Sequence, residues 1–176
     1  DEVRLDTRRL AVGRDTTASG ENATAFGMNT KAGGAGSLAA GFGSIAAGLT
    51  AVALGNQTEA SDEGAFAAGV YSVSSGTYST SFGYATKASG YAATALGYLS
   101  EASGAFATAL GNRTLASGGN SAALGHETKA SGDASTSMGE FTEASGLAAT
   151  ALGSNTTANG DRSVALGWGS VASGGA

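Results

Sequence analysis

Large apolar residues recur at one place in a 14-residue repeat that runs through most of the chain. One half of the repeat, as in AATALG (92–97), ends in a large apolar residue and glycine, whereas the other, as in TKASG (86–90), ends in a small residue and glycine. Glycine occupies 23 of the 24 positions spaced seven apart from Gly13 to Gly174, and Asp62 occupies the remaining one. A register kept for this length indicates a β-solenoid with short coils.

Each half-repeat predicts a short strand, because glycine inside a helix costs about 1 kcal/mol relative to alanine. Alternate residues of a strand face opposite sides, so the glycine and the residues two and four before it share one face. These positions hold almost only small residues, and the one four before the second glycine is Ser or Thr in every repeat, from Thr16 to Ser170. We therefore expect a flattened roll with two strands per turn, filled by small side chains, with the glycines at its corners.

The number of repeats sets the expected size of the roll. About twelve turns at about 4.8 Å per turn predict a prism roughly 58 Å long. Asp62 stands where the repeat calls for glycine, and Gly64 follows it. Because aspartate adopts left-handed backbone more readily than most residues, we expect a modified corner or a local bulge there, not a break in the register.

The outward sides of the two half-repeats differ in polarity. In the second half, the residue three before glycine is charged in half of the repeats, and one-turn stacking would place Lys87 beside Glu101 and Lys129 beside Glu143. In the first half, the residue before glycine is apolar, and where it is only alanine, at 40 and 68, the residue two earlier is large. We name the large members of this stripe the seam: Val12, Phe26, Leu38, Leu54, Phe66, Phe82, Leu96, Leu110, Leu124, Met138, Leu152 and Leu166.

The seam predicts association between copies of the chain. The interior of the roll admits only small side chains, so the seam has to lie outside it, and a long exposed apolar stripe marks an association surface. A large apolar side chain contributes about 1.5–3 kcal/mol when it is fully buried, before chain entropy is subtracted. We therefore expect a homo-oligomer whose seams meet on the symmetry axis.

Composition argues against several other classes of protein. The chain has 176 residues, no cysteine, a single histidine and a net charge of −5 without a basic cluster, so we expect neither thiol chemistry nor a nucleic-acid partner. His126 falls at a corner and is interpreted as a solvated residue; no acidic pair or calcium-binding nonapeptide occurs. We expect no enzyme, cofactor or metal, no entry of this segment into a membrane, and, because the repeat runs close to both ends, a piece of a longer protein.

The units SAALGHETKASG (121–132), SVALGWGSVASG (163–174) and ATALGYLSEASG (93–104) resemble the haemagglutinin-type repeat of YadA-like heads in trimeric autotransporter adhesins. The resemblance covers essentially the whole chain, so residues 1–176 are expected to form one head domain, without recognisable neck, stalk or anchor. It implies an all-β, left-handed parallel β-roll that associates as a homotrimer. It also implies a place on the cell surface of a Gram-negative bacterium, held by a coiled-coil stalk and an outer-membrane anchor, and a role in virulence.

The resemblance implies cell adhesion, with a host matrix protein, a cell receptor or a glycan as the partner. Aromatic residues around the corner after the first glycine are the candidate ligand-binding residues, and capping of the seams against water is the alternative role: Phe42, Tyr71, Tyr84, Tyr98 and Trp168. The alternative function is a rigid spacer with the binding site elsewhere. An ice-binding solenoid ranks last, because the regular Ser/Thr column is expected inside the roll.

Overall fold

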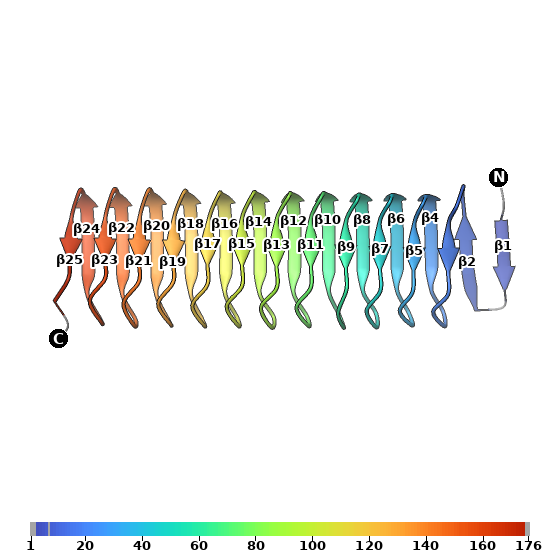
Figure 1. Cartoon of the computed structure of the whole chain (residues 1–176), viewed down its shortest axis with the longest axis horizontal. Helices are drawn as coiled ribbons and strands as arrows, with labels where there is room; N and C mark the ends of the chain where they lie inside the picture. The colour runs from blue at the N-terminus through green and yellow to red at the C-terminus, as the bar shows by residue number, and fades with distance from the viewer. Residues whose placement is uncertain (1–2, 7, 175–176) are drawn as a thin grey trace.

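The computed structural model describes residues 3–6 and 8–174, and this part of the chain is built from β-strands joined by tight turns. The chain passes alternately through a longer and a shorter strand, and the resulting turns stack side by side into an elongated roll (Figure 1). The small, glycine-marked half-repeats therefore do form strands. The predicted all-β parallel roll of about twelve turns is confirmed.

The longer strands form one sheet, which we call the long-strand sheet, and the shorter ones form a second, the short-strand sheet. The long-strand sheet contains β1 (Val3–Asp6), β2 (Arg9–Val12), β4 (Thr24–Met28), β6 (Leu38–Phe42), β8 (Val52–Asn56), β10 (Phe66–Val70), β12 (Thr80–Tyr84), β14 (Thr94–Tyr98), β16 (Thr108–Asn112), β18 (Ala122–His126), β20 (Thr136–Glu140), β22 (Thr150–Ser154) and β24 (Val164–Trp168). The short-strand sheet contains β3 (Thr17–Ala18), β5 (Lys31–Ala32), β7 (Ile45–Ala46), β9 (Glu59–Ala60), β11 (Val73–Ser74), β13 (Lys87–Ala88), β15 (Glu101–Ala102), β17 (Leu115–Ala116), β19 (Lys129–Ala130), β21 (Glu143–Ala144), β23 (Thr157–Ala158) and β25 (Val171–Ala172).

Each strand from β2 onward pairs in parallel with the equivalent strand of the next turn, 14 residues further on. Leu96 pairs with Leu110 in one sheet, and Lys87 pairs with Glu101 in the other. The first strand is the exception, since β1 runs antiparallel to β2. Every column of the sequence repeat is therefore a row of side chains along the roll.

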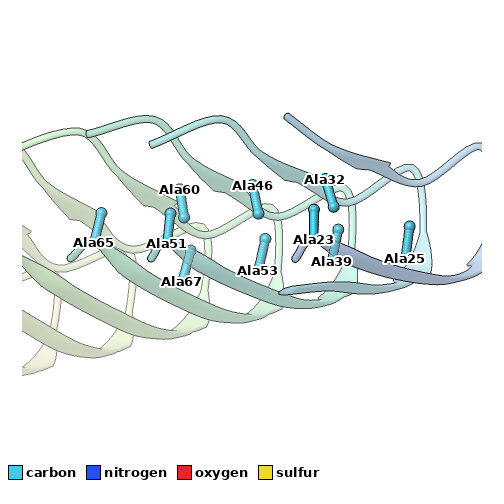
Figure 2. Packing of buried hydrophobic residues seen from close by; sticks show 10 residues of the cluster. All are labelled: Ala23, Ala25, Ala32, Ala39, Ala46, Ala51, Ala53, Ala60, Ala65 and Ala67. Atoms are coloured by element: carbon cyan, nitrogen blue, oxygen red, sulfur yellow. The ribbon is translucent and has the colours of Figure 1, made fainter. Parts of the chain in front are cut away.

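The interior is filled by small side chains, as the pattern predicts. Ala46, Ala53 and Ala60 have no exposed surface, and Figure 2 shows such alanines of the two sheets pointing toward one another in the narrow space between them. No leucine or phenylalanine would fit in this space, which is why the large apolar residues lie on the outside.

Buried hydroxyls tie successive turns together. Thr86 donates from Oγ1 to Oγ of Ser72 at 3.0 Å, and Ser72 donates to the carbonyl oxygen of Gly83 at 2.9 Å. Thr58 and Ser44 repeat the arrangement at 3.0 Å two turns earlier. The Ser/Thr column thus lies inside the roll, as expected, and does not form the exposed hydroxyl row that ice binding would need.

The corners differ from the prediction, because their left-handed residues are not the repeating glycines. In the described part of the chain, the residue two after each repeating glycine holds that conformation, as in Leu99 (φ 52°) and Phe106 (φ 58°). Gly97 lies within β14 at φ 114°, and a Cβ there would stand 2.0 Å from the carbonyl oxygen of Gly111. Gly104 begins a turn without positive φ, but a Cβ there would also stand 2.0 Å from a carbonyl oxygen, that of Gly118. Close approach of the next turn is therefore the shared requirement.

Asp62 fits the roll without a break, although the reason differs from the predicted one. Strands β9 and β11 pair in parallel across this turn, with Ala60 opposite Ser74. The left-handed residue of the corner is Gly64 (φ 62°), not Asp62. The Asp62 carboxylate accepts hydrogen bonds from the Glu63 amide at 2.8 Å and from the Thr77 hydroxyl at 2.9 Å. These bonds anchor the modified corner to the next turn.

Candidate binding surface

The outer face of the long-strand sheet carries three parallel rows of side chains. In β14, Thr94, Leu96 and Tyr98 face outward, because they alternate with the buried Ala95 and with Gly97. The seam is the middle row together with Leu38 and Phe66 of the first row, and the residue after the first glycine forms the third row on the same face. The sequence placed that third row at a corner, yet the structure makes it the last residue of each long strand from β4 to β24.

The seam lies on the surface of the single chain. Its most exposed members are Phe26, Phe82, Leu110, Met138 and Leu166, between 38% and 58% exposed. The other members are partly exposed: Val12, Leu38, Leu54, Phe66, Leu96, Leu124 and Leu152. Ala68 is 5% exposed next to the larger Phe66, in line with the exchange of volume between the two rows. A roll with this face uncovered leaves a continuous apolar stripe in water.

Three of the five predicted ligand-binding residues lie together. The rings of Tyr84 and Tyr98 stack with centroids 5.2 Å apart and planes 13° from parallel. Tyr71 meets Tyr84 edge to face at 5.9 Å, and each of the three rings is between 44% and 47% exposed. They form a small aromatic platform, the Tyr84 platform, beside the seam.

Phe42 and Trp168 lie in the same row but away from the Tyr84 platform. Phe42 ends β6, and strands β8 and β10 lie between it and β12, which carries Tyr84. Trp168 ends β24, and strands β16, β18, β20 and β22 lie between it and β14, which carries Tyr98. Trp168 is 80% exposed. The structure therefore separates these two rings from the others, and of the five predicted residues only Tyr71, Tyr84 and Tyr98 offer a shared surface.

His126 lies at the end of β18, among acidic and aromatic side chains. Its Nδ1 is 3.7 Å from Glu140 Oε1, its Nε2 is 3.9 Å from Glu127 Oε1, and its ring meets Phe141 edge to face at 5.2 Å. The side chain is 42% exposed. Within residues 3–6 and 8–174, no group of three His, Cys, Asp or Glu side chains is arranged to hold a metal ion.

The short-strand sheet has a charged outer face, as predicted. Lys87 Nζ lies 3.4 Å from Glu101 Oε1, and Lys129 Nζ lies 3.0 Å from Glu143 Oε1. Both pairs join neighbouring turns of the roll and are about half exposed. This face is therefore suited to contact with water.

Sequence reasoning missed a second aromatic group on the opposite edge of the roll. We call the edge where a long strand passes to the next short strand the first edge, and the other the second edge; they lie at the top and bottom of Figure 1. On the second edge, Tyr91 meets Tyr78 edge to face at 6.0 Å and Phe106 at 5.3 Å. The signal was three large aromatic residues in columns that elsewhere hold mainly small or polar ones.

Tyr78 also bonds to a carboxylate. Its hydroxyl donates to Glu63 Oε1 at 2.8 Å. This hydrogen bond, together with the negative charge of Glu63, raises the pKa of Tyr78 above the usual value of a phenol. The phenol therefore stays neutral, and donates to Glu63, throughout the physiological pH range.

Comparison with known families follows the repeat closely. The family model described as YadA head domain repeat (2 copies) matches residues 10–30, 18–44, 32–58, 46–72, 74–100, 88–114, 116–139 and 144–174. These stretches include most of the chain. No curated protein matches it significantly. Among the described residues, no helix is long and apolar enough to cross a membrane.

Proposed function

Because the chain belongs to the family of YadA head domain repeats, we propose that it is the head of a trimeric autotransporter adhesin and attaches a bacterium to host matrix or cell receptors. The family is one of structural adhesins and not of enzymes. We assign residues 1–176 to a single head domain, of which residues 1, 2, 7, 175 and 176 lie outside the described part. The left-handed coil and the anchoring to the outer membrane belong to the same proposal.

The exposed seam is the observation that carries the proposal of a homotrimer. Large apolar side chains such as Phe82 and Leu166 recur along the whole face, although 55% and 58% of their surface meets water in the single chain. Burying such a side chain completely contributes about 1.5–3 kcal/mol, and covering the part of each seam residue that is still exposed would favour association. Three long-strand sheets facing one axis would cover all three seams.

Adhesion follows from repetition of an exposed patch. The Tyr84 platform is a rigid aromatic surface, and tyrosine provides large contact area at low entropic cost. The platform flanks the seam on the side of the first edge, so a trimer that covers the seams would present it three times, at the rims of its interfaces, where weak individual contacts add up through avidity. The three rings are each nearly half exposed on the outside of the roll, which favours an extended partner such as a matrix protein or a glycan chain over a small molecule.

A rigid spacer is the second candidate function. The unbroken register from β2 to β24 favours it, because a continuous stack of this kind can hold another domain at a distance without any exposed binding residue. The spacer and the adhesin share the trimer and differ only in whether the Tyr84 platform binds.

A binding panel separates the two functions. The purified chain is tested against immobilised matrix proteins, glycans and cultured cells, and compared with the variant Tyr84→Ala/Tyr98→Ala. We expect at least one partner to bind and the variant to weaken that binding about tenfold or more, with unchanged mass and melting temperature. Phe141→Ala is the matched control, since it removes another exposed ring from the first edge, and should bind normally.

The panel also has a result that decides for the spacer. If neither the chain nor its cell-surface display binds any member, the head is a spacer. Equal binding by Tyr84→Ala/Tyr98→Ala and the unmodified chain would place adhesion on another surface of the same head.

A further inference from the structure

The second edge carries an aromatic strip that the adhesive proposal does not use. Tyr78, Tyr91 and Phe106 come from three successive turns and contact one another edge to face, with interplanar angles of 86° and 76°. They are 51%, 49% and 56% exposed. The Tyr84 platform lies by the first edge, so the strip is a separate surface.

The fold does not need aromatic residues at these positions. Tyr78 and Phe106 each hold left-handed backbone at φ 58°, where bulky side chains are strained. The same column holds Asn22 and Asn120 at φ 57° and 55°, and asparagine suits this conformation better. Tyr78 packs against Gly64, yet about half of each ring stays exposed at the surface of the roll. This exposed aromatic surface points to a role in binding.

Carboxylates lie at one end of the strip. Glu63 accepts the hydroxyl of Tyr78 at 2.8 Å, and the neighbouring Asp62 accepts that of Thr77 at 2.9 Å. The turns of this edge at 61–64, 75–79, 89–93 and 103–107 contain no Lys or Arg. Lys87, on the short-strand face, is already paired with Glu101. The strip therefore combines ring faces with uncompensated negative charge.

We propose that the aromatic strip of Tyr78, Tyr91 and Phe106, with Glu63 and Asp62, binds arginine side chains of an extended segment of a partner protein. A guanidinium group stacks on aromatic faces and forms paired hydrogen bonds to a carboxylate. Neighbouring rings near right angles give a cation two ring faces to contact. A sugar would instead favour a flat platform, and these rings are not coplanar.

The spacing fits an extended peptide. Alternate side chains of such a peptide lie about 6.8 Å apart, close to the 6.0 Å between the ring centroids of Tyr78 and Tyr91. Arginines two positions apart can therefore reach neighbouring rings. This inference goes beyond the proposed function and does not depend on the Tyr84 platform.

The test uses a fluorescein-labelled ten-residue peptide of alternating Arg and Ser, and a second peptide in which citrulline replaces every Arg. Fluorescence anisotropy with the whole chain should show saturable binding of the first peptide only, because citrulline keeps the shape and loses the charge. Tyr78→Asn/Phe106→Asn should weaken binding about tenfold while the melting temperature stays equal or rises. Glu63→Gln should weaken it about threefold and make it less sensitive to salt.

Leu99→Asn/Phe141→Asn is the matched control, because it makes the same kind of change at left-handed positions of the first edge (φ 52° and 51°). This control should bind the arginine peptide normally, as should Tyr84→Ala/Tyr98→Ala. Equal loss in both asparagine variants, or equal binding of the citrulline peptide, would overturn the proposal. The proposal would also be overturned if Tyr78→Asn/Phe106→Asn reduced the mass of the assembly, because a second copy of the chain would then be the occupant. The same holds if this variant kept its binding to the arginine peptide and lost binding to neutral glycans.

Discussion

The long-strand sheet and the short-strand sheet stand back to back on one alanine interior, yet their outer faces have opposite character. Leu110, in the seam, is 42% exposed beside apolar neighbours in the turns before and after it. On the other face, Lys129 pairs with Glu143 of the next turn. Because the interior is the same on both sides, the outer face can change without altering the fold.

This difference teaches which positions carry architecture and which carry association. Apart from Arg9 in the first turn and Asp62 at a glycine position, the inward rows hold only Gly, Ala, Ser and Thr, because the space between the sheets is narrow. The outward rows have no such limit, so their apolar or charged character reflects what each face contacts. The comparison can be tested one face at a time.

Charging the seam should have the largest effect. Leu110→Lys would place three unpaired ammonium groups at the proposed trimer axis, and each uncompensated buried charge costs about 3–5 kcal/mol. We expect the trimer to dissociate at micromolar concentration, which light scattering would record as a fall of the mass to about one third.

Leu115→Lys is the control for this change. Leu115 lies in β17, where the chain has crossed to the short-strand face, and pairs there with Glu101 and Lys129 of the neighbouring turns. The same substitution on this face should leave the mass unchanged. A soluble folded monomer of the unmodified chain, or an intact trimer of Leu110→Lys, would contradict the assignment of the seam to the interface.

Replacing a glycine by alanine should have a smaller effect than charging the seam, and the loss in the free energy of unfolding should differ between the two sheets. Gly97→Ala combines a Cβ 2.0 Å from the Gly111 carbonyl oxygen with φ 114°, so we expect a loss of about 4 kcal/mol in the free energy of unfolding. Gly104→Ala has the close contact without the unfavourable φ, and about 2 kcal/mol is expected. Urea unfolding of both variants measures the difference.

Asp62 is the reason to expect a smaller loss of stability for Gly104→Ala than for Gly97→Ala. It shows that the glycine column after the short strands accepts a Cβ with local adjustment, whereas the column inside the long strands is glycine in all twelve repeats. If Gly104→Ala destabilised the roll as much as Gly97→Ala, close contact alone would decide the cost, and the backbone angle of Gly97 would have no separate effect.

The sequence was sufficient for the fold because each column has a single structural role. The period gave the parallel register, and the small columns identified the interior, as the buried Ala53 and Thr86 confirm. It was not sufficient for the corners: left-handed residues such as Leu99 and Phe106 have no common side-chain type, so no composition signal marks them. The contact of Tyr78, Tyr91 and Phe106 was missed for another reason, because it joins two adjacent columns across three turns, and reading each column by itself does not show it.

The charged face should yield the smallest effect, and Lys129→Glu measures it. The substitution replaces an attraction across 3.0 Å by repulsion between the introduced carboxylate and that of Glu143 in the adjacent turn, but both side chains of the native pair are nearly half exposed, so water screens the interaction. We expect a loss of about 0.5–1 kcal/mol in the free energy of unfolding at low salt, with most of it recovered at about 1 M NaCl, where the screening length is about 3 Å. Lys31→Glu is the matched control, because its neighbours in the column are Thr17 and Ile45 and offer no carboxylate. If both variants lost the same stability with the same salt dependence, the cost would come from the change in net charge, and the ladder of Lys and Glu would not stabilise the stacking of the turns.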